Sequence, residues 1–243
     1  MSATRAPMHL QGPDDAPLRP EIELLGERLP LENARLLELG CGAAVMTRLI
    51  AERYPVAALV ATEVDTTQHA KNLAMGPIPK VTFTAGGAEC VEADDASFDV
   101  VLMFKSLHHV PDPLLDGALG EVARVLRPGG LAWISEPVYA GPYNDIMKLF
   151  HDERVVRERA FAAIRRVVES GRLELEHELF FHAPVKFADF AEFDRRMLQV
   201  THTEHRLDAA LYAKVRKAFE VHLGPEGARF AQPMRVDLLR RPA

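Results

Sequence analysis

Short apolar runs alternate with segments of helical periodicity through the first half of the chain. The runs have the length and near-continuous hydrophobicity of strands that are buried on both faces. They lie at residues 36–42, 57–64, 81–84, 98–104 and 131–135. Apolar positions at helical spacing predict helices at 20–29, 43–54, 66–75 and 112–126. This alternation predicts an α/β fold with a doubly wound, mainly parallel sheet.

The pattern changes after residue 137. Apolar spacing there predicts one long helix at 144–170, further helices at 187–199 and 207–223, and a closing strand at 228–240. Residues 138–226 are therefore interpreted as a helical insertion after the fifth strand. It would overhang the carboxyl ends of the strands and recognise a substrate. Residues 1–20, with four prolines, are predicted to be a flexible arm of a single domain spanning 1–243.

A glycine turn follows the first predicted strand. Gly40 and Gly42 remove side chains where a ligand would approach the backbone. Glu38, at the end of that strand, suits a cationic or amine-bearing ligand and would repel a pyrophosphate. Val45 stands where a dinucleotide fingerprint needs a small residue. These features favour a nucleotide-type pocket and argue against a nicotinamide-dependent dehydrogenase.

Composition narrows the classes of partner and compartment. The net charge of −6 gives no general affinity for nucleic acid. No apolar run approaches the ~20 residues of a membrane span, and the N-terminal 20 residues have no apolar core typical of a signal peptide. Two cysteines are too few for a disulfide framework. A cytoplasmic protein without nucleic-acid or membrane partners is expected, of undetermined oligomeric state.

Five landmarks occur in a characteristic order within residues 30–137. They are Glu38-Leu39-Gly40-Cys41-Gly42, the acid Glu63, Gly87-Ala88-Glu89, Phe98-Asp99-Val100-Val101 leading to Leu107-His108-His109-Val110, and Arg124-Val125-Leu126-Arg127-Pro128-Gly129-Gly130. With these landmarks the segment resembles the class I methyltransferases that use S-adenosylmethionine. The resemblance is to the branch with a Leu-His-His-Val loop, the type 11-like methyltransferases.

The resemblance implies transfer of a methyl group from S-adenosylmethionine to a small-molecule acceptor. It places the methionine end of the cofactor near Glu38, Gly40, Cys41 and Gly42, with Lys105 and Ser106 beside the sulfonium. Glu63 would bind the ribose hydroxyls. The adenine would lie against Gly87, Ala88 and Glu89, where Ala88 would offer its backbone N–H.

Two departures from the family pattern keep a second function open. Ala44 stands where the family usually has a third glycine, and Gly87 replaces an acid that often accepts a hydrogen bond from the adenine amine. Losing one such bond costs ~1 kcal/mol. A non-catalytic protein that binds S-adenosylmethionine or S-adenosylhomocysteine is therefore the main alternative to an enzyme, with the dehydrogenase a less favoured one.

Several polar residues have alternative interpretations. His108 and His109 are interpreted either as structural residues of their loop or, for His109, as a general base facing the acceptor. Asp65 rivals Glu63 as the ribose ligand but is better explained as a helix N-cap. No metal site is predicted, since His202 and His205 have no clear third ligand. The candidate acceptor contacts are Tyr139, Tyr143, His151, Arg195, Arg196, His202 and His205.

Overall fold

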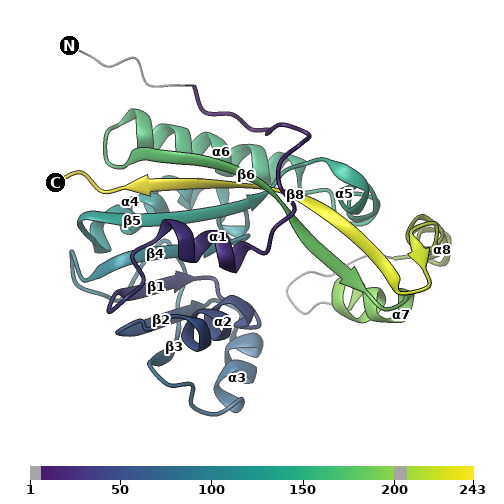
Figure 1. Ribbon diagram of the computed structural model, residues 1–243, viewed down its shortest axis with the longest axis horizontal. Helices are drawn as coiled ribbons and strands as arrows, with labels where there is room; N and C mark the ends of the chain where they lie inside the picture. The colour runs from purple at the N-terminus through teal and green to yellow at the C-terminus, as the bar shows by residue number, and fades with distance from the viewer. Residues whose placement is uncertain (1–6, 200–206) are drawn as a thin grey trace.

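A computed structural model describes residues 7–199 and 207–243 (Figure 1). The strands are β1 (Arg35–Leu39), β2 (Ala58–Glu63), β3 (Val81–Ala85), β4 (Phe98–Phe104), β5 (Leu126–Pro137), β6 (Glu174–Phe187), β7 (Leu223–Gly224) and β8 (Gly227–Arg240). The α-helices are α1 (Glu21–Arg28), α2 (Val45–Arg53), α3 (Thr66–Ala74), α4 (Leu115–Val125), α5 (Gly141–Met147), α6 (Arg154–Glu169), α7 (Phe190–Phe193) and α8 (Ala209–Glu220). Short 3-10 turns are η1 (Leu107–His109) and η2 (Asp112–Leu114), and η3 (Asp194–Leu198) is a π-helix.

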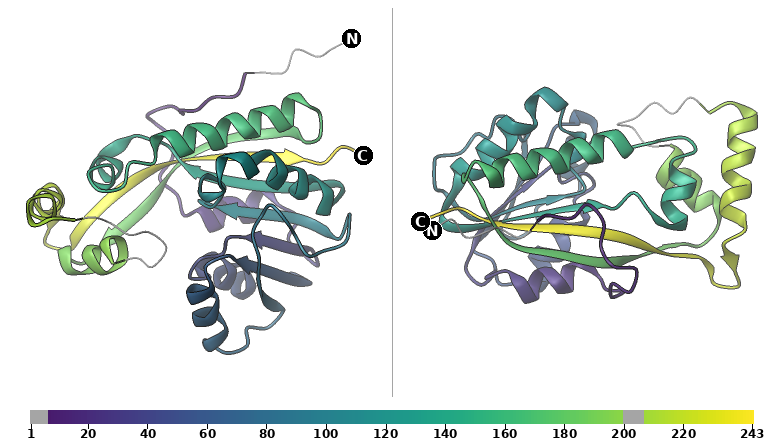
Figure 2. Two further views of the ribbon diagram at one scale, coloured as in Figure 1. Left: turned by 180° about the vertical axis from the view of Figure 1, so that it is seen from behind. Right: turned by 90° about the horizontal axis from the view of Figure 1, so that it is seen from above.

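The strands form one sheet in the order β3-β2-β1-β4-β5-β8-β6, with β7 paired to β8. The pairings from β3 to β5 are parallel, whereas β8 is antiparallel to both β5 and β6. Helices cover both faces, with α6 on one side and α1 on the other (Figure 2). The predicted fold class, an α/β protein with a doubly wound, mainly parallel sheet, is confirmed.

Each central strand supplies two separate hydrophobic cores. Leu37, Leu39 and Val101 point into the core that α4 and α6 cover, whereas Leu36 and Val100 point into the core beneath α1 and α2. Successive side chains on a strand point to opposite faces, so a strand between two helical layers needs apolar residues at every position. This is why these strands appear in the sequence as continuous apolar runs.

The predicted long helix at 144–170 is wrong, because the structure divides it into α5 and α6. Residues 148–153 separate the two helices, and the Asp152 carboxylate accepts a hydrogen bond from the backbone N–H of Arg154 as α6 begins. Asp side chains compete for backbone donors and favour helix starts over helix interiors. The apolar spacing of the two helices is nearly in phase, so periodicity alone did not show the break.

Strand β6 has no counterpart in the sequence-based prediction, and it shows that residues 138–226 are not wholly helical. Its side chains are mostly exposed or half-buried, so it lacks the apolar run of the central strands. It forms through pairing with β8 along its whole length, from Glu174↔Arg240 to Phe187↔Ala228. The helix predicted at 187–199 is reduced to α7 and η3. The predicted closing strand is confirmed as β8.

The described part of the N-terminal arm packs against β6. The backbone N–H of His182 donates to the carbonyl of Pro17 at 2.8 Å, and the N–H of Arg19 donates to the carbonyl of His182 at 2.9 Å. Gly12 lies so close to the Phe180 ring that an added Cβ would overlap it. The prediction of a flexible arm is therefore wrong for residues 7–20, since a loose segment would not make these bonds.

The far ends of β6 and β8 extend beyond the rest of the sheet and carry α5, α7 and α8 (Figure 1). These elements enclose a third core that is rich in aromatic side chains. Phe187, Phe193 and Phe219 are fully buried in it. We call these elements, the far halves of β6 and β8 with α5, α7, η3 and α8, the distal unit.

Candidate active site

A glycine turn and several polar residues lie at the ends of four neighbouring strands, at one edge of the sheet. The glycine turn follows β1, Glu63 ends β2, Lys105 and Ser106 follow β4, and Glu136 is the penultimate residue of β5. Because these four strands are parallel, their carboxyl ends lie together. Ligands of open α/β sheets bind outside this edge.

The turn after β1 has backbone angles in the left-handed region, which glycine adopts readily. Gly40 and Gly42 have φ of 73° and 51°. A Cβ added to Gly40 would lie 2.8 Å from Cβ of Ser106, whereas one added to Gly42 would meet no atom within 4 Å. Gly40 is thus required by packing within the protein, and Gly42 opens onto free space. Ala44, the N-cap of α2, also has a positive φ of 55°.

Glu63 is nearly buried and binds the glycine turn. Its Oε2 accepts from the backbone N–H of Gly42 at 2.6 Å, and its Oε1 accepts from the N–H of Asp65 at 2.9 Å. The Asp65 carboxylate caps α3 by accepting from the N–H of Thr67 and Gln68, so its interpretation as an N-cap is confirmed. The ribose contact of Glu63 stays a prediction.

Asn72 is a second residue that holds the same turn through a hydrogen bond. The sequence did not indicate this role of Asn72. It is fully buried in α3 and donates from Nδ2 to the carbonyl of Gly42 at 2.8 Å. Gln68, one turn earlier, donates to the Asn72 Oδ1 at 2.9 Å. The available signal was a pair of amides at i and i+4 on one face of the predicted helix.

Glu38 and Cys41 lie beneath the turn. The Glu38 carboxylate is buried and accepts from Thr47 Oγ1 at 2.6 Å. Burial, with Glu21 and Glu63 nearby, raises the Glu38 pKa to about 8. Burial also raises the pKa of the Cys41 thiol to about 12. Glu38 therefore positions the start of α2 in this structure, and a ligand contact by Glu38 stays a prediction.

In the segment after β3, the carboxylate of Glu89 lies beside Gly87. Gly87 lacks a side chain, and a Cβ added there would overlap the Glu89 carboxylate. Glu89 itself is exposed, whereas Ala88 is buried. The carboxylate of Glu89 thus occupies the place that a side chain at position 87 would take.

The loop after β4 presents Lys105 and Ser106 to the edge. Lys105 is exposed, has a positive φ of 56°, and donates its backbone N–H to the Ser135 carbonyl at 2.7 Å. Ser106 donates from Oγ to the Leu39 carbonyl at 2.7 Å. Strained backbone of this kind is concentrated at functional sites.

His108 and His109 in η1 differ sharply in environment. His108 is buried, and its Nδ1 contacts the Glu136 carboxylate. The Nε2 of His108 lies 3.4 Å from Oε1 of Glu153. These two carboxylates outweigh burial and raise the His108 pKa to about 9. His109 is exposed at the same edge, with its ring centroid 4.1 Å from that of His108.

The structure places the predicted acceptor residues in different parts of the molecule. His151 joins the histidine loop, because its Nε2 lies 2.9 Å from Oε1 of Glu153. Tyr143 belongs to the aromatic core, where burial raises its pKa. Arg195 and Arg196 are exposed on η3 in the distal unit. His202 and His205 lie outside the described residues.

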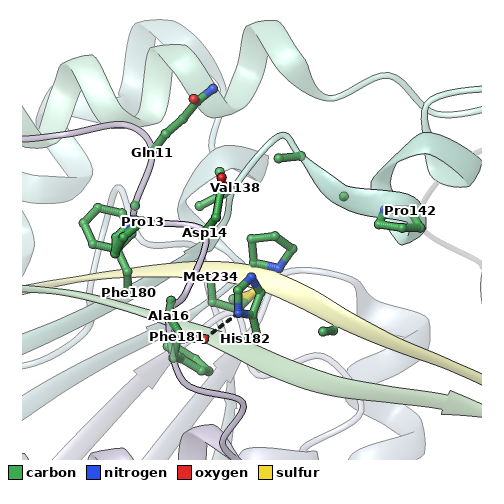
Figure 3. Close-up of a pocket in the computed structure, with 15 residues that line it drawn as sticks. Gln11, Pro13, Asp14, Ala16, Val138, Pro142, Phe180, Phe181, His182 and Met234 are labelled. Atoms are coloured by element: carbon green, nitrogen blue, oxygen red, sulfur yellow. Dashed lines mark hydrogen bonds between the residues drawn. The ribbon is translucent and has the colours of Figure 1, made fainter.

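Two cavities lie between the arm and the end of β5. The first, of about 230 Å³, is lined by Phe180, His182 and Met234, and His182 Nδ1 contacts the Ala16 carbonyl at 2.8 Å (Figure 3). The second, of about 310 Å³, is lined by Tyr139, Glu136 and three arginines. Neither of these two cavities is lined by Gly40, Gly42 or Glu63.

The sequence did not point to Glu136, Glu153 or Arg157, which surround the histidines. Glu136 was readable as an acid at the end of a buried strand, directly before a proline. Glu153 and Arg157 are separated by one helical turn, but they lay inside the wrongly predicted long helix. Their role depends on where α6 packs, which no local pattern specifies.

Comparison with known proteins identifies the class. Residues 36–130 match the model of a methyltransferase domain. The chain is 33% identical over 135 residues to an uncharacterized methyltransferase of Mycobacterium tuberculosis, covering 54% of this chain and 53% of the relative. It is 36% identical over 113 residues to a ubiquinone biosynthesis O-methyltransferase of Maricaulis maris, covering 44% and 42%. The chain thus spans about half the length of the curated relatives that it matches.

The fold agrees with the sequence match. The YcgJ protein of Bacillus subtilis superimposes with a TM-score of 0.63 at 17% identity, covering 91% of this chain and 98% of that one. The methyltransferase-domain match over residues 36–130 agrees with the resemblance seen in the sequence, and the superposition shows that the fold is shared. Among the described residues, no helix is both long and apolar enough to cross a membrane.

Proposed function

We propose that this protein transfers a methyl group from S-adenosylmethionine to a small-molecule acceptor. The glycine turn after β1, which opens onto free space at Gly42 and is bound by the acid that ends β2, carries this proposal. A ligand with an amino acid end and a ribose needs both features, a bare backbone and a nearby carboxylate. The family of the chain supports the same cofactor.

The residues present fit that cofactor. Gly42 leaves space beside the turn, and Glu63 would exchange its backbone partners for the ribose hydroxyls. Glu89 supplies an exposed carboxylate where the family often places an acid for the adenine amine. The sulfonium of the cofactor supplies an activated methyl group, so the protein needs mainly to hold the acceptor in line with it.

His109 is the candidate general base. It is exposed at the carboxyl edge of β4, next to the loop that would flank the sulfonium. Imidazole titrates near neutral pH and accepts a proton efficiently there. A base is needed only when the acceptor atom carries a proton that it must lose, so the role of His109 depends on the acceptor.

The net charge of −6 gives no general affinity for nucleic acid, which agrees with a small-molecule acceptor. The two cysteines, Cys41 and Cys90, are unpaired. Free thiols are typical of a reducing compartment. The cytoplasm is therefore the proposed location.

Calorimetry with a matched pair of glycine variants tests cofactor binding. We expect Gly42→Ala to weaken S-adenosylmethionine binding by about tenfold or more, because its methyl group enters the open space, and a tenfold loss corresponds to ~1.4 kcal/mol. Gly76→Ala is the control, since Gly76 also has a positive φ and open space around it. Equal, normal binding by both variants would show that the ligand does not cross this turn.

A non-catalytic binding protein is the second candidate. Both oxygens of Glu63 are already bonded to backbone N–H groups, and the acid at position 87 is missing. Binding of S-adenosylhomocysteine without methyl transfer to any member of a metabolite pool would favour it. The dehydrogenase alternative has no support in the family of the chain, and an NADH fluorescence titration tests it directly. Val45, offered against that alternative as a packing residue, is 55% exposed and does not pack there.

A further inference from the structure

Two loops bring imidazoles and a carboxylate to one point beside the proposed site. His108 and His109 come from η1, and Glu153 is the N-cap residue of α6. One ligand atom from each of these residues lies within 4.8 Å of the others. We propose that His108, His109 and Glu153 bind one divalent transition-metal ion of the Zn²⁺ type.

Glu136 orients His108 for this role. Its carboxylate contacts Nδ1 of His108 and accepts the backbone N–H of Leu107 at 3.0 Å. A carboxylate on Nδ1 leaves Nε2 to face Glu153 and carry the lone pair. Metal-binding histidines almost always have such a partner on the nitrogen away from the metal.

Glu153 is also fixed by its neighbours. Its Oε2 accepts from Arg157 at 2.5 Å, and Arg157 in turn donates to Oδ1 of Asn144 at 3.0 Å. The other oxygen, Oε1, faces Nε2 of His108 at 3.4 Å and Nε2 of His151 at 2.9 Å. One oxygen is thus held by the guanidinium while the second points at the imidazoles.

The charges favour a cation at this point. Arg157 donates to Glu153, and Arg235, which lies near Glu136, is paired with Asp237, so with neutral histidines the group keeps an excess negative charge. Two competing occupants neutralise it, a metal ion or a proton that makes His108 an imidazolium between two carboxylates. Two imidazoles and one carboxylate form a donor set that binds Zn²⁺, with one position left for water or substrate.

The inference stands apart from the proposed methyl transfer, because metal binding is measured without cofactor or acceptor. It changes one role in that proposal. A ring nitrogen of His109 that binds metal is not available as a general base. A metal-loaded enzyme with full activity would therefore exclude His109 as the base, whereas a metal-free enzyme with full activity would leave His109 available for that role.

The test uses the full chain after treatment with a chelator. We expect calorimetry with Zn²⁺ to give one site per chain, and Co²⁺ to give the intense visible absorption of a tetrahedral ion. His109→Gln and Glu153→Gln should each weaken binding by about 100-fold, and Glu136→Gln by about 10- to 100-fold, the range for partners of metal ligands. His109 is exposed, so its variant should remain folded, as circular dichroism will check.

Matched controls come from the same elements or residue types. Glu158→Gln changes an exposed acid on α6, and His177→Gln changes an exposed histidine on β6. Both should bind Zn²⁺ like the unmodified protein. The proposal is overturned if the unmodified protein takes up no ion, or if the His109 and Glu153 variants bind as tightly as these controls. The first result would assign the group to a buried imidazolium.

Discussion

The carboxyl ends of β1, β2 and β4, which we call the cofactor edge after the proposed ligand, are built from different interactions than the distal unit. At the cofactor edge, short polar contacts hold a bare backbone in place, as Glu63 and Asn72 do for the turn at Gly42. The distal unit is held by aromatic packing, with Phe187 in contact with the rings of Phe193 and Phe219. The first arrangement fixes the shape of the turn through particular polar contacts, and the second stabilises its elements through apolar packing.

This difference fits the extent of the match to the methyltransferase-domain model. The matched segment, residues 36–130, contains the cofactor edge and ends before α5. A polar turn works only with particular residues at particular places, so it leaves a readable motif. An aromatic core tolerates exchange among residues of similar volume. The distal unit is therefore free to differ between proteins that share the cofactor edge, which suits a role in acceptor choice.

The largest expected effect comes from the centre of the distal unit. Phe187→Ala should lower the free energy of unfolding by ~3–5 kcal/mol, the usual cost of removing a buried phenylalanine ring. Urea unfolding followed by the fluorescence of Trp133, the single tryptophan, is the measurement. Trp133 is buried in β5, so its fluorescence reports the unfolding of the main sheet and not of the distal unit.

The result decides whether the two regions unfold together. Because β8 pairs with β5 in the main sheet and continues with β6 into the distal unit, we expect the Trp133 transition to move to lower urea in Phe187→Ala. Phe150→Ala, at the half-buried edge of the same core, should have a much smaller effect. An unchanged Trp133 transition, with an earlier loss of circular dichroism, would make the distal unit an independent folding unit.

The second effect concerns the acid at the cofactor edge. Glu63→Ala should weaken binding of S-adenosylmethionine by ~1.5–3 kcal/mol, the scale of a hydrogen bond to a charged group. Calorimetry beside Asp65→Ala separates the two acids, because the Asp65 carboxylate caps α3. Normal binding by Glu63→Ala and failure by Asp65→Ala would reverse the assignment of the ribose ligand.

The same contrast governs what the sequence could predict. Strands β1 and β4, the turn at Gly40 and the N-cap at Asp65 follow from local residue types, and all were predicted. Strand β6 exists because β8 pairs with it, and its half-exposed residues give no local signal. Glu136 and Glu153 meet at His108 only through the packing of α6 on η1. Sequence patterns thus predicted the contacts made by near neighbours and missed those made by distant ones.

A third prediction uses the buried acid under the turn. The pKa of Glu38 is raised from an ordinary 4.5 to about 8, so the folded protein keeps this proton after the unfolded chain has lost it. Between pH 5 and 8 the unfolded state therefore binds fewer protons, and stability falls as pH rises. Glu38→Gln lacks this dependence. Its stability relative to the unmodified protein should rise by about 2 kcal/mol between pH 5 and 6.5 and further up to pH 8, measured by urea unfolding at each pH. A constant difference would mean that Glu38 is ionised in the folded state.

The smallest effect tests strain at the turn. Ala44 has a left-handed φ of 55° and no side-chain cap on α2, a position where glycine is better tolerated than alanine. Ala44→Gly should raise the free energy of unfolding by about 0.5–1 kcal/mol.

Ala96→Gly is the matched control, since Ala96 has a φ of 53° in a loop before β4. Both variants should gain stability in urea, but only Ala44→Gly, beside the ligand turn, should also change the affinity for S-adenosylmethionine. Equal affinity in both would limit the importance of position 44 to the backbone. A loss of stability in Ala44→Gly alone would show that the buried methyl group of Ala44 contributes more than its strained backbone costs.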